Sequence, residues 1–178
     1  MVESRQILYS MLAGVAAGAV GSVVIAVTVS STFNEFLYEV VYHQLASSGV
    51  GRAAEVANLT VQSVGQLAHW LLPVAPLING LLLGVLLGLL LDLLTRRLHI
   101  KPWAASLITG LTYVALLQAL PLTLVSLAYG RWIVDLLARY VGLAAVFAPS
   151  ATYTATLLLL NTVKGPWTRL GEAEPEIY

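Results

Sequence analysis

The chain contains no cysteine and very few charged residues. Without cysteine it has no disulfide, no thiolate metal ligand, no thiol nucleophile and no cysteine-held iron–sulfur cluster. Only 10% of its 178 residues are charged, whereas a soluble domain carries about 25%. The nine basic and nine acidic residues cancel, so no strong positive field attracts nucleic acid. These absences argue against a thiol enzyme, a nucleic-acid-binding protein and an ordinary soluble domain.

The sequence is rich in hydrophobic residues, which form several long apolar runs. Hydrophobic residues make up 58% of the chain, and its mean hydropathy is +0.84. Because runs of about 18 apolar residues are typical of transmembrane helices, the sequence predicts four spans. They cover approximately residues 7–31, 70–94, 103–128 and 141–163. The first is too long for a signal-peptide core, so we expect it to stay as a span. The predicted fold is all-α: one membrane domain, residues 1–178, formed by a bundle of four transmembrane helices.

The basic residues predict the orientation of this bundle, because Lys and Arg gather in cytoplasmic loops. With four spans, the side that holds the termini carries Arg5, Arg96, Arg97, Lys101, Lys164 and Arg169. The other side carries Arg52, Arg131 and Arg139. We therefore expect a multi-pass protein of the cell (plasma) membrane with both termini cytoplasmic. Residues 33–69 form the outer loop and 165–178 a short acidic cytoplasmic tail. The sequon at Asn58 is then outside, as a glycosylation site or as a chance match.

The stretch "EFLYEVVYH" (35–43) predicts an amphipathic extracytoplasmic helix between the first two spans. Its polar face includes Glu35, Glu39 and His43, four residues apart. Glu35 and His43 are separated by about 12 Å along a helix, so one ion cannot bind all three. Two readings stay open: a Glu39, His43 and His69 site for Zn or another divalent cation, or a solvated helix face with Glu39 and His43 as an ordinary pair.

Small residues recur every four positions in two of the predicted spans. The first span carries Ser10, Gly14, Gly18, Ser22 and Ala26; the second carries Gly80, Gly84 and Gly88. Lipid gives helices no hydrophobic reason to associate, so close backbone approach across small residues holds such spans together. These residues are predicted helix-packing surfaces. They face each other within one chain, or they face another subunit.

Charged groups within the predicted spans are scarce. Asp92 has Arg96 four residues on, which predicts a helical ion pair, and Asp135 with Arg139 repeats the spacing before the fourth span. Neutral polar residues inside the spans satisfy backbone carbonyls freed by prolines, or they line a path for a solute. The residues of that candidate polar path are Asn79, Gln118 and Thr152.

No catalytic or cofactor motif stands out, and we expect neither an enzyme nor a bound cofactor. The expected partners are membrane lipids and other membrane subunits, or further copies of the chain, but no nucleic acid. The leading functional expectation is a non-catalytic integral membrane subunit that provides helix-packing surface in a larger respiratory or transport assembly. The alternative is a small transporter or channel component for a neutral solute or a divalent cation.

Overall fold

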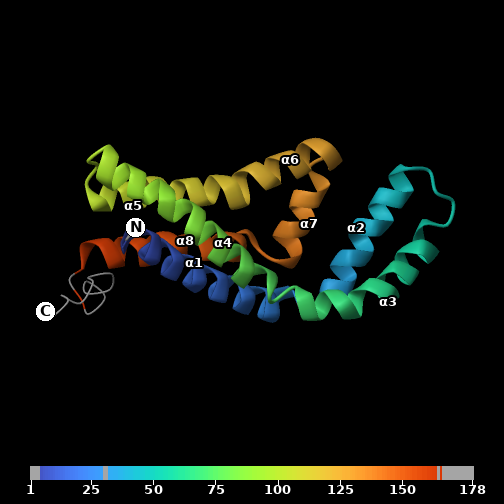
Figure 1. Ribbon diagram of the computed structural model, residues 1–178. Helices are drawn as coiled ribbons and strands as arrows, with labels where there is room; N and C mark the ends of the chain where they lie inside the picture. The colour runs from blue at the N-terminus through green and yellow to red at the C-terminus, as the bar shows by residue number, and fades with distance from the viewer. Residues whose placement is uncertain (1–4, 30–31, 164, 166–178) are drawn as a thin grey trace, which may run out of the picture.

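The computed structural model is all-helical over the residues that it describes, 5–29, 32–163 and 165 (Figure 1). Within helices, the side chains of Val29, Gln66, Ala68, His69 and Trp70 lie outside this description. The first half of the chain forms α1 (Arg5–Val24) with a π-helical end η1 (Ile25–Val29), α2 (Phe33–Ser47), α3 (Ala53–Leu71) and α4 (Ala75–Asp92) with a π-helical end η2 (Leu93–Arg97). The second half forms α5 (Pro102–Val114), η3 (Ala115–Ala119), α6 (Leu120–Tyr129), α7 (Trp132–Tyr140) and α8 (Leu143–Thr162).

Four helices are long and apolar enough to cross a membrane, in agreement with the four predicted spans. They cover Arg5–Thr28, Ala75–Arg97, Pro102–Tyr129 and Leu143–Thr162. The second begins later than predicted, because α3 ends at Leu71 and a turn precedes α4. Pro76 stands in the first turn of α4, where a missing backbone N–H costs nothing.

The third of these helices is continuous but not regular. Pro121 cannot donate a hydrogen bond to the preceding turn, and the π-helical segment η3 lies directly before it. The helix ends at Gly130, whose φ of +93° suits a residue without a side chain. The chain can therefore reverse into α7.

Helix α1 packs against both α4 and α8, and α8 in turn packs against α5, which also contacts α4. Three tyrosines, Tyr9, Tyr113 and Tyr153, are the largest fully buried side chains among the described residues. Tyr113 and Tyr153 stack with ring centroids 4.3 Å apart, and Tyr153 shares a 2.6 Å hydrogen bond with Ser10. The core therefore joins α5 to α8 by stacked rings and α1 to α8 by a hydrogen bond.

Helices α2 and α3 pair as a hairpin that extends beyond the end of the bundle (Figure 1). The sequence predicts one amphipathic extracytoplasmic helix in this segment; the structure has a helix there, α2, and its place outside the membrane stays a prediction. The second helix, α3, is not part of that prediction. Helix α7 lies beside α2 and joins the hairpin to the bundle.

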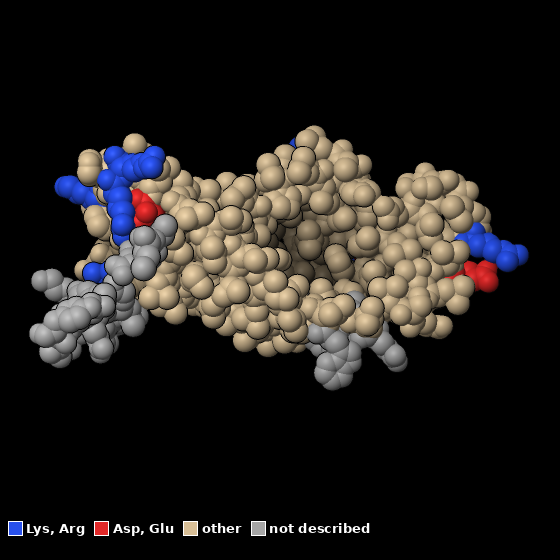
Figure 2. Space-filling view, in the orientation of Figure 1, with Lys and Arg blue, Asp and Glu red and all other residues tan. Residues whose placement is uncertain are grey.

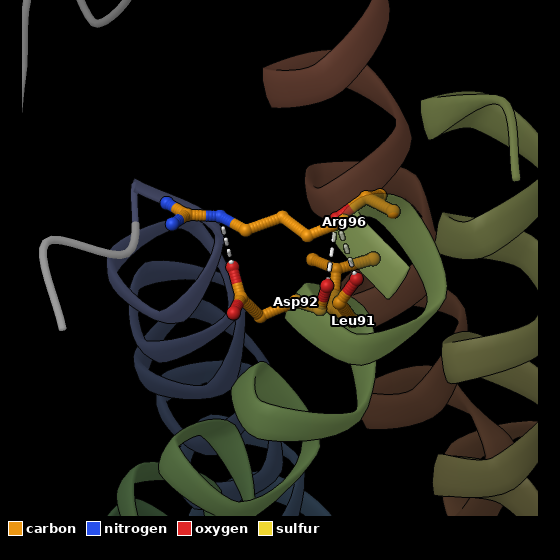
Figure 3. A network of polar contacts seen from close by, with 4 residues as sticks. Leu91, Asp92 and Arg96 are labelled. Carbon is orange, nitrogen blue, oxygen red and sulfur yellow. Dashed lines mark hydrogen bonds and ion pairs between the residues drawn. The ribbon is translucent and has the colours of Figure 1, made fainter. Parts of the chain in front are cut away.

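Charged side chains gather at the two ends of the molecule (Figure 2). Lys and Arg cluster where α4 leads into α5, and both signs occur at the tip of the hairpin, where Arg52 lies 3.8 Å from Glu55. The predicted pair of Asp92 and Arg96 is present at the end of α4: Arg96 Nε lies 2.7 Å from Asp92 Oδ1 (Figure 3). Asp92 is thus paired at the boundary of a span.

Candidate functional site

The polar face of α2 contacts α7. The phenol of Tyr140 donates a hydrogen bond to Glu39 Oε1 at 2.9 Å, and Arg139 Nη1 lies 3.8 Å from the same oxygen. Arg139 therefore approaches Glu39, whereas the sequence predicts Asp135 as its partner. The rings of Phe36 and Tyr140 meet edge to face with centroids 5.8 Å apart. These contacts hold the hairpin against the bundle.

The structure brings no complete set of metal ligands together in the part that it describes. No group of three or more His, Asp or Glu residues there could hold an ion. His43 stacks on Trp132, with ring centroids 4.9 Å apart, and Glu39 accepts the bond from Tyr140. The third predicted ligand, His69, has its side chain outside the described part. The site of Glu39, His43 and His69 therefore stays a prediction.

The contact between α2 and α7 borders an open, polar cavity of about 510 Å³. The hydrogen bond to Glu39 raises the pKa of Tyr140 above its usual value, and the negative charge of Glu39 acts in the same direction. The phenol is therefore a neutral donor at neutral pH. Because its pKa is raised on folding, the stability that this bond contributes is lost only as the pH rises through that higher pKa. The cavity is lined by Asn34, Glu35, Tyr38, Glu39, Asn58, Val61, Arg139 and Tyr140.

The two small-residue surfaces face each other within the chain. A Cβ built on Gly80 would overlap the carbonyl oxygen of Gly14 and lie 3.1 Å from the Cα of Gly18. A Cβ on Gly84 would lie 2.8 Å from the carbonyl oxygen of Ser10. The residues that meet are Gly80, Gly84 and Gly88 on α4, and Ile7, Ser10, Gly14 and Gly18 on α1. Of the two readings of these surfaces, the described contacts fit packing within one chain.

Ser22 is a polar bridge at the end of this contact. Its hydroxyl lies within hydrogen-bond distance of the carbonyl oxygens of Gly18 in its own helix and of Pro73 in the turn before α4. That turn has no regular helical hydrogen bonding of its own. The hydroxyl therefore links α1 to the turn at which α3 changes into α4.

Two of the three residues of the predicted polar path line one interhelical cavity. Asn79 and Gln118 are on the wall of a cavity of about 370 Å³ that is otherwise mostly apolar. Thr152 is not on that wall, and its hydroxyl donates to the carbonyl of Ala148 in its own helix. The structure therefore places Asn79 and Gln118, but not Thr152, on one cavity wall, and the path through all three stays a prediction.

Gln118 has a structural role on the cavity wall. Its amide nitrogen donates to the carbonyl of Val146 at 3.1 Å, and its amide oxygen accepts from the hydroxyl of Ser150 at 2.6 Å. Both partners are in the turn of α8 that contains Pro149, whose missing N–H removes a helical hydrogen bond. Gln118 therefore ties η3 to the proline-containing turn of α8 through both of its amide atoms.

Helix α3 exposes an apolar strip that the long apolar runs of the sequence do not include. Leu59, Leu67 and Leu71 are 58%, 65% and 59% exposed, and they fall on one side of the helix at four- and eight-residue spacing. Val56 and Val64, which are also exposed, flank them. The residues that face α2 are instead small, as at Gly65, which lies beside Asn34. The amphipathic period of residues 53–71 is the signal that could have revealed this surface.

The described fold defines a class of protein: an all-helical chain with four helices suited to a membrane. Comparison with family models, with curated proteins and with solved structures gives no match for this chain. The function is therefore argued from the surfaces and cavities of the chain itself.

Proposed function

We propose that the chain is a non-catalytic integral membrane subunit that docks another membrane subunit through the exposed strip of α3. The observation that carries this proposal is the strip itself, Leu59, Leu67 and Leu71 with Val56 and Val64, on a hairpin that extends beyond the bundle (Figure 1). Contiguous exposed apolar surface outside a membrane marks an interaction site.

The opposite side of the hairpin supports an aqueous location. Glu35, Glu39 and Arg139 line the open polar cavity between α2, α3 and α7, and charged groups of this kind need water. The tip carries the exposed pair of Arg52 and Glu55. If water surrounds the base and the tip, the apolar strip between them is stable only when another surface covers it.

The spacing of the strip indicates what covers it. Leucines at i, i+8 and i+12 on one helix face suit a second helix that packs along α3. The glycine surfaces of α1 and α4 contact each other, so they are not free for this purpose. The proposed interface is therefore on the hairpin, whereas the small-residue surfaces stabilise the subunit itself.

Native mass spectrometry of the tagged chain, purified in mild detergent from its own membranes, tests this proposal. We expect a second subunit at fixed stoichiometry. Leu67→Gln should weaken its binding roughly tenfold or more, because a buried leucine contributes about 1.5–3 kcal/mol. The control Ala54→Gln changes an exposed residue on another side of α3 and should leave the complex intact. A monomer or a homo-oligomer alone, or equal loss in both variants, would contradict the proposal.

A second candidate is transport of a neutral solute or divalent cation, and the joint presence of Asn79 and Gln118 on one cavity wall favours it. Gln118 is already bonded on both its nitrogen and its oxygen, and Thr152 lies elsewhere, so this support is narrower. Solute flux in liposomes that contain only the purified chain would favour transport over the subunit role.

We further propose that the protein resides in the plasma membrane with both termini cytoplasmic and the hairpin outside. The excess of basic residues at the end where α4 joins α5 supports this orientation. Because the chain has no cysteine, single cysteines at Ser48 and His99 can be labelled specifically. An impermeant maleimide applied to intact cells should react with Ser48→Cys and not with His99→Cys until the cells are opened. Reaction at both sites in intact cells would rule out this topology.

A further inference from the structure

The interhelical cavity has no charged residue on its wall. It lies where the ends of α1 and α5, the beginnings of α2, α4 and α8 and the end of α7 meet, and its volume is about 370 Å³. Figure 2 shows a hollow in the middle of the molecule, among residues that carry no charge. Phe33 and Phe36 of α2 are on its wall, so the base of the hairpin closes one side. A cavity of this size is at the lower end of the range for small-molecule sites.

Tyr113 gives this cavity an unused hydrogen-bonding group. The residue lines the cavity and is only 2% exposed, yet its hydroxyl makes no hydrogen bond with any described group. Its stacking partner Tyr153 is bonded to Ser10, and Gln118 is bonded to α8 through both amide atoms. Because Tyr113 lines the cavity and its hydroxyl is not among the buried polar atoms left without a partner, that hydroxyl can hydrogen-bond to the polar group of a molecule in the cavity.

Asn79 adds a second polar group on the same wall. Its side chain is exposed to the cavity region and makes no hydrogen bond with another described residue. The amide can donate or accept, and the phenol can do the same. The remaining wall is formed mainly by aliphatic and aromatic residues and prolines. An ion would lose its hydration here without gaining a counter-charge.

The geometry points to a binding site for an uncharged amphiphile: an aliphatic molecule whose single hydroxyl or carbonyl group hydrogen-bonds to Tyr113 and Asn79 and whose chain fills the apolar part of the cavity. This inference is independent of the docking role proposed for α3, since none of the exposed strip residues of α3 lines the cavity. Loss of the partner in the Leu67→Gln variant and loss of ligand from the cavity are separate observations.

Photolabelling of the full chain in lipid nanodiscs tests the site, with a diazirine-bearing octanol as the probe. Peptide mapping should place the label on cavity-lining residues, and unlabelled octan-1-ol should compete, whereas octanoate should compete far less. Ala145→Phe places a ring in the cavity and should abolish this labelling. Ala144→Phe adds the same ring at the adjacent exposed residue, which is not on the cavity wall, and should leave labelling unchanged.

Tyr113→Phe separates binding at this wall from unspecific partition into lipid. The ring and its stacking on Tyr153 are retained, so the fold should persist, while the half-saturating octanol concentration should rise roughly two- to tenfold for one lost hydrogen bond. Label spread over lipid-facing residues, equal competition by octanoate, or unchanged half-saturation in a folded Tyr113→Phe variant would overturn the proposal.

Discussion

Gly80→Ala should lower the free energy of unfolding by about 3 kcal/mol, at the upper end of the usual cost of overpacking. The added Cβ would overlap the carbonyl oxygen of Gly14 and lie 3.1 Å from both the Cα and the nitrogen of Gly18. All three are backbone atoms and cannot rotate away, so α1 and α4 would have to separate along their whole contact. Thermal denaturation of the purified chain in detergent, followed by circular dichroism, measures the loss.

Two other glycines provide the matched controls for this result. A Cβ on Gly51 meets nothing within 4 Å, so Gly51→Ala should be neutral or slightly stabilising. A Cβ on Gly65 would lie 2.8 Å from Asn34 Oδ1, the end of a flexible side chain, so Gly65→Ala should have a small effect. Equal stability of all three variants would show that α1 and α4 do not approach as closely as described.

The sequence predicts the small-residue surfaces but not what they face. A repeat of glycine every four residues specifies one side of a helix, and any helix with a similar surface can pack there. The pairing of Gly14 with Gly80 depends on how four helices are arranged around the buried tyrosines. The four spans could be predicted from hydropathy, because each span is one continuous apolar run. Which spans pack against each other could not be predicted, because that depends on the arrangement of all four helices.

The hairpin shows a second limit of predicting structure from long apolar runs alone. Residues 53–71 contain polar residues at short intervals, so they resemble a polar loop when scanned for long apolar runs. In a helix the same residues separate into the apolar strip of α3 and a side that packs on α2. The apolar side of α3 is visible only when residues are compared at helical spacing, because the average hydropathy of the segment mixes its apolar and polar sides.

The partners of Glu39 and His43 could not be read from local spacing. Tyr140 is 101 residues from Glu39 in the chain, and Trp132 belongs to the same distant helix. A tertiary contact of this kind leaves no periodic signal in either segment. The sequence therefore identified polar groups that need partners, and the fold supplied them from α7.

Tyr153→Ala should have an effect at least as large as Gly80→Ala, by removing the ring at the centre of the core. Tyr153 is fully buried, stacks on Tyr113 and contacts α1 through the 2.6 Å hydrogen bond with Ser10. Truncation of a buried aromatic residue to alanine costs about 3–5 kcal/mol, because the transfer free energy of the ring is lost and a cavity remains.

Tyr153→Phe removes only the hydroxyl and so decides whether packing or hydrogen bonding stabilises this core. Interhelical hydrogen bonds in membrane proteins contribute about 0.6 kcal/mol on average and at most about 1.7 kcal/mol. The freed Ser10 hydroxyl can also donate to its own helix, as Thr109 does to the carbonyl of Ala105. We therefore expect Tyr153→Phe to lose less than a third of the stability that Tyr153→Ala loses, in thermal denaturation under identical detergent conditions. Equal losses in the two variants would mean that the bond between α1 and α8, and not the stacked rings, holds the bundle together.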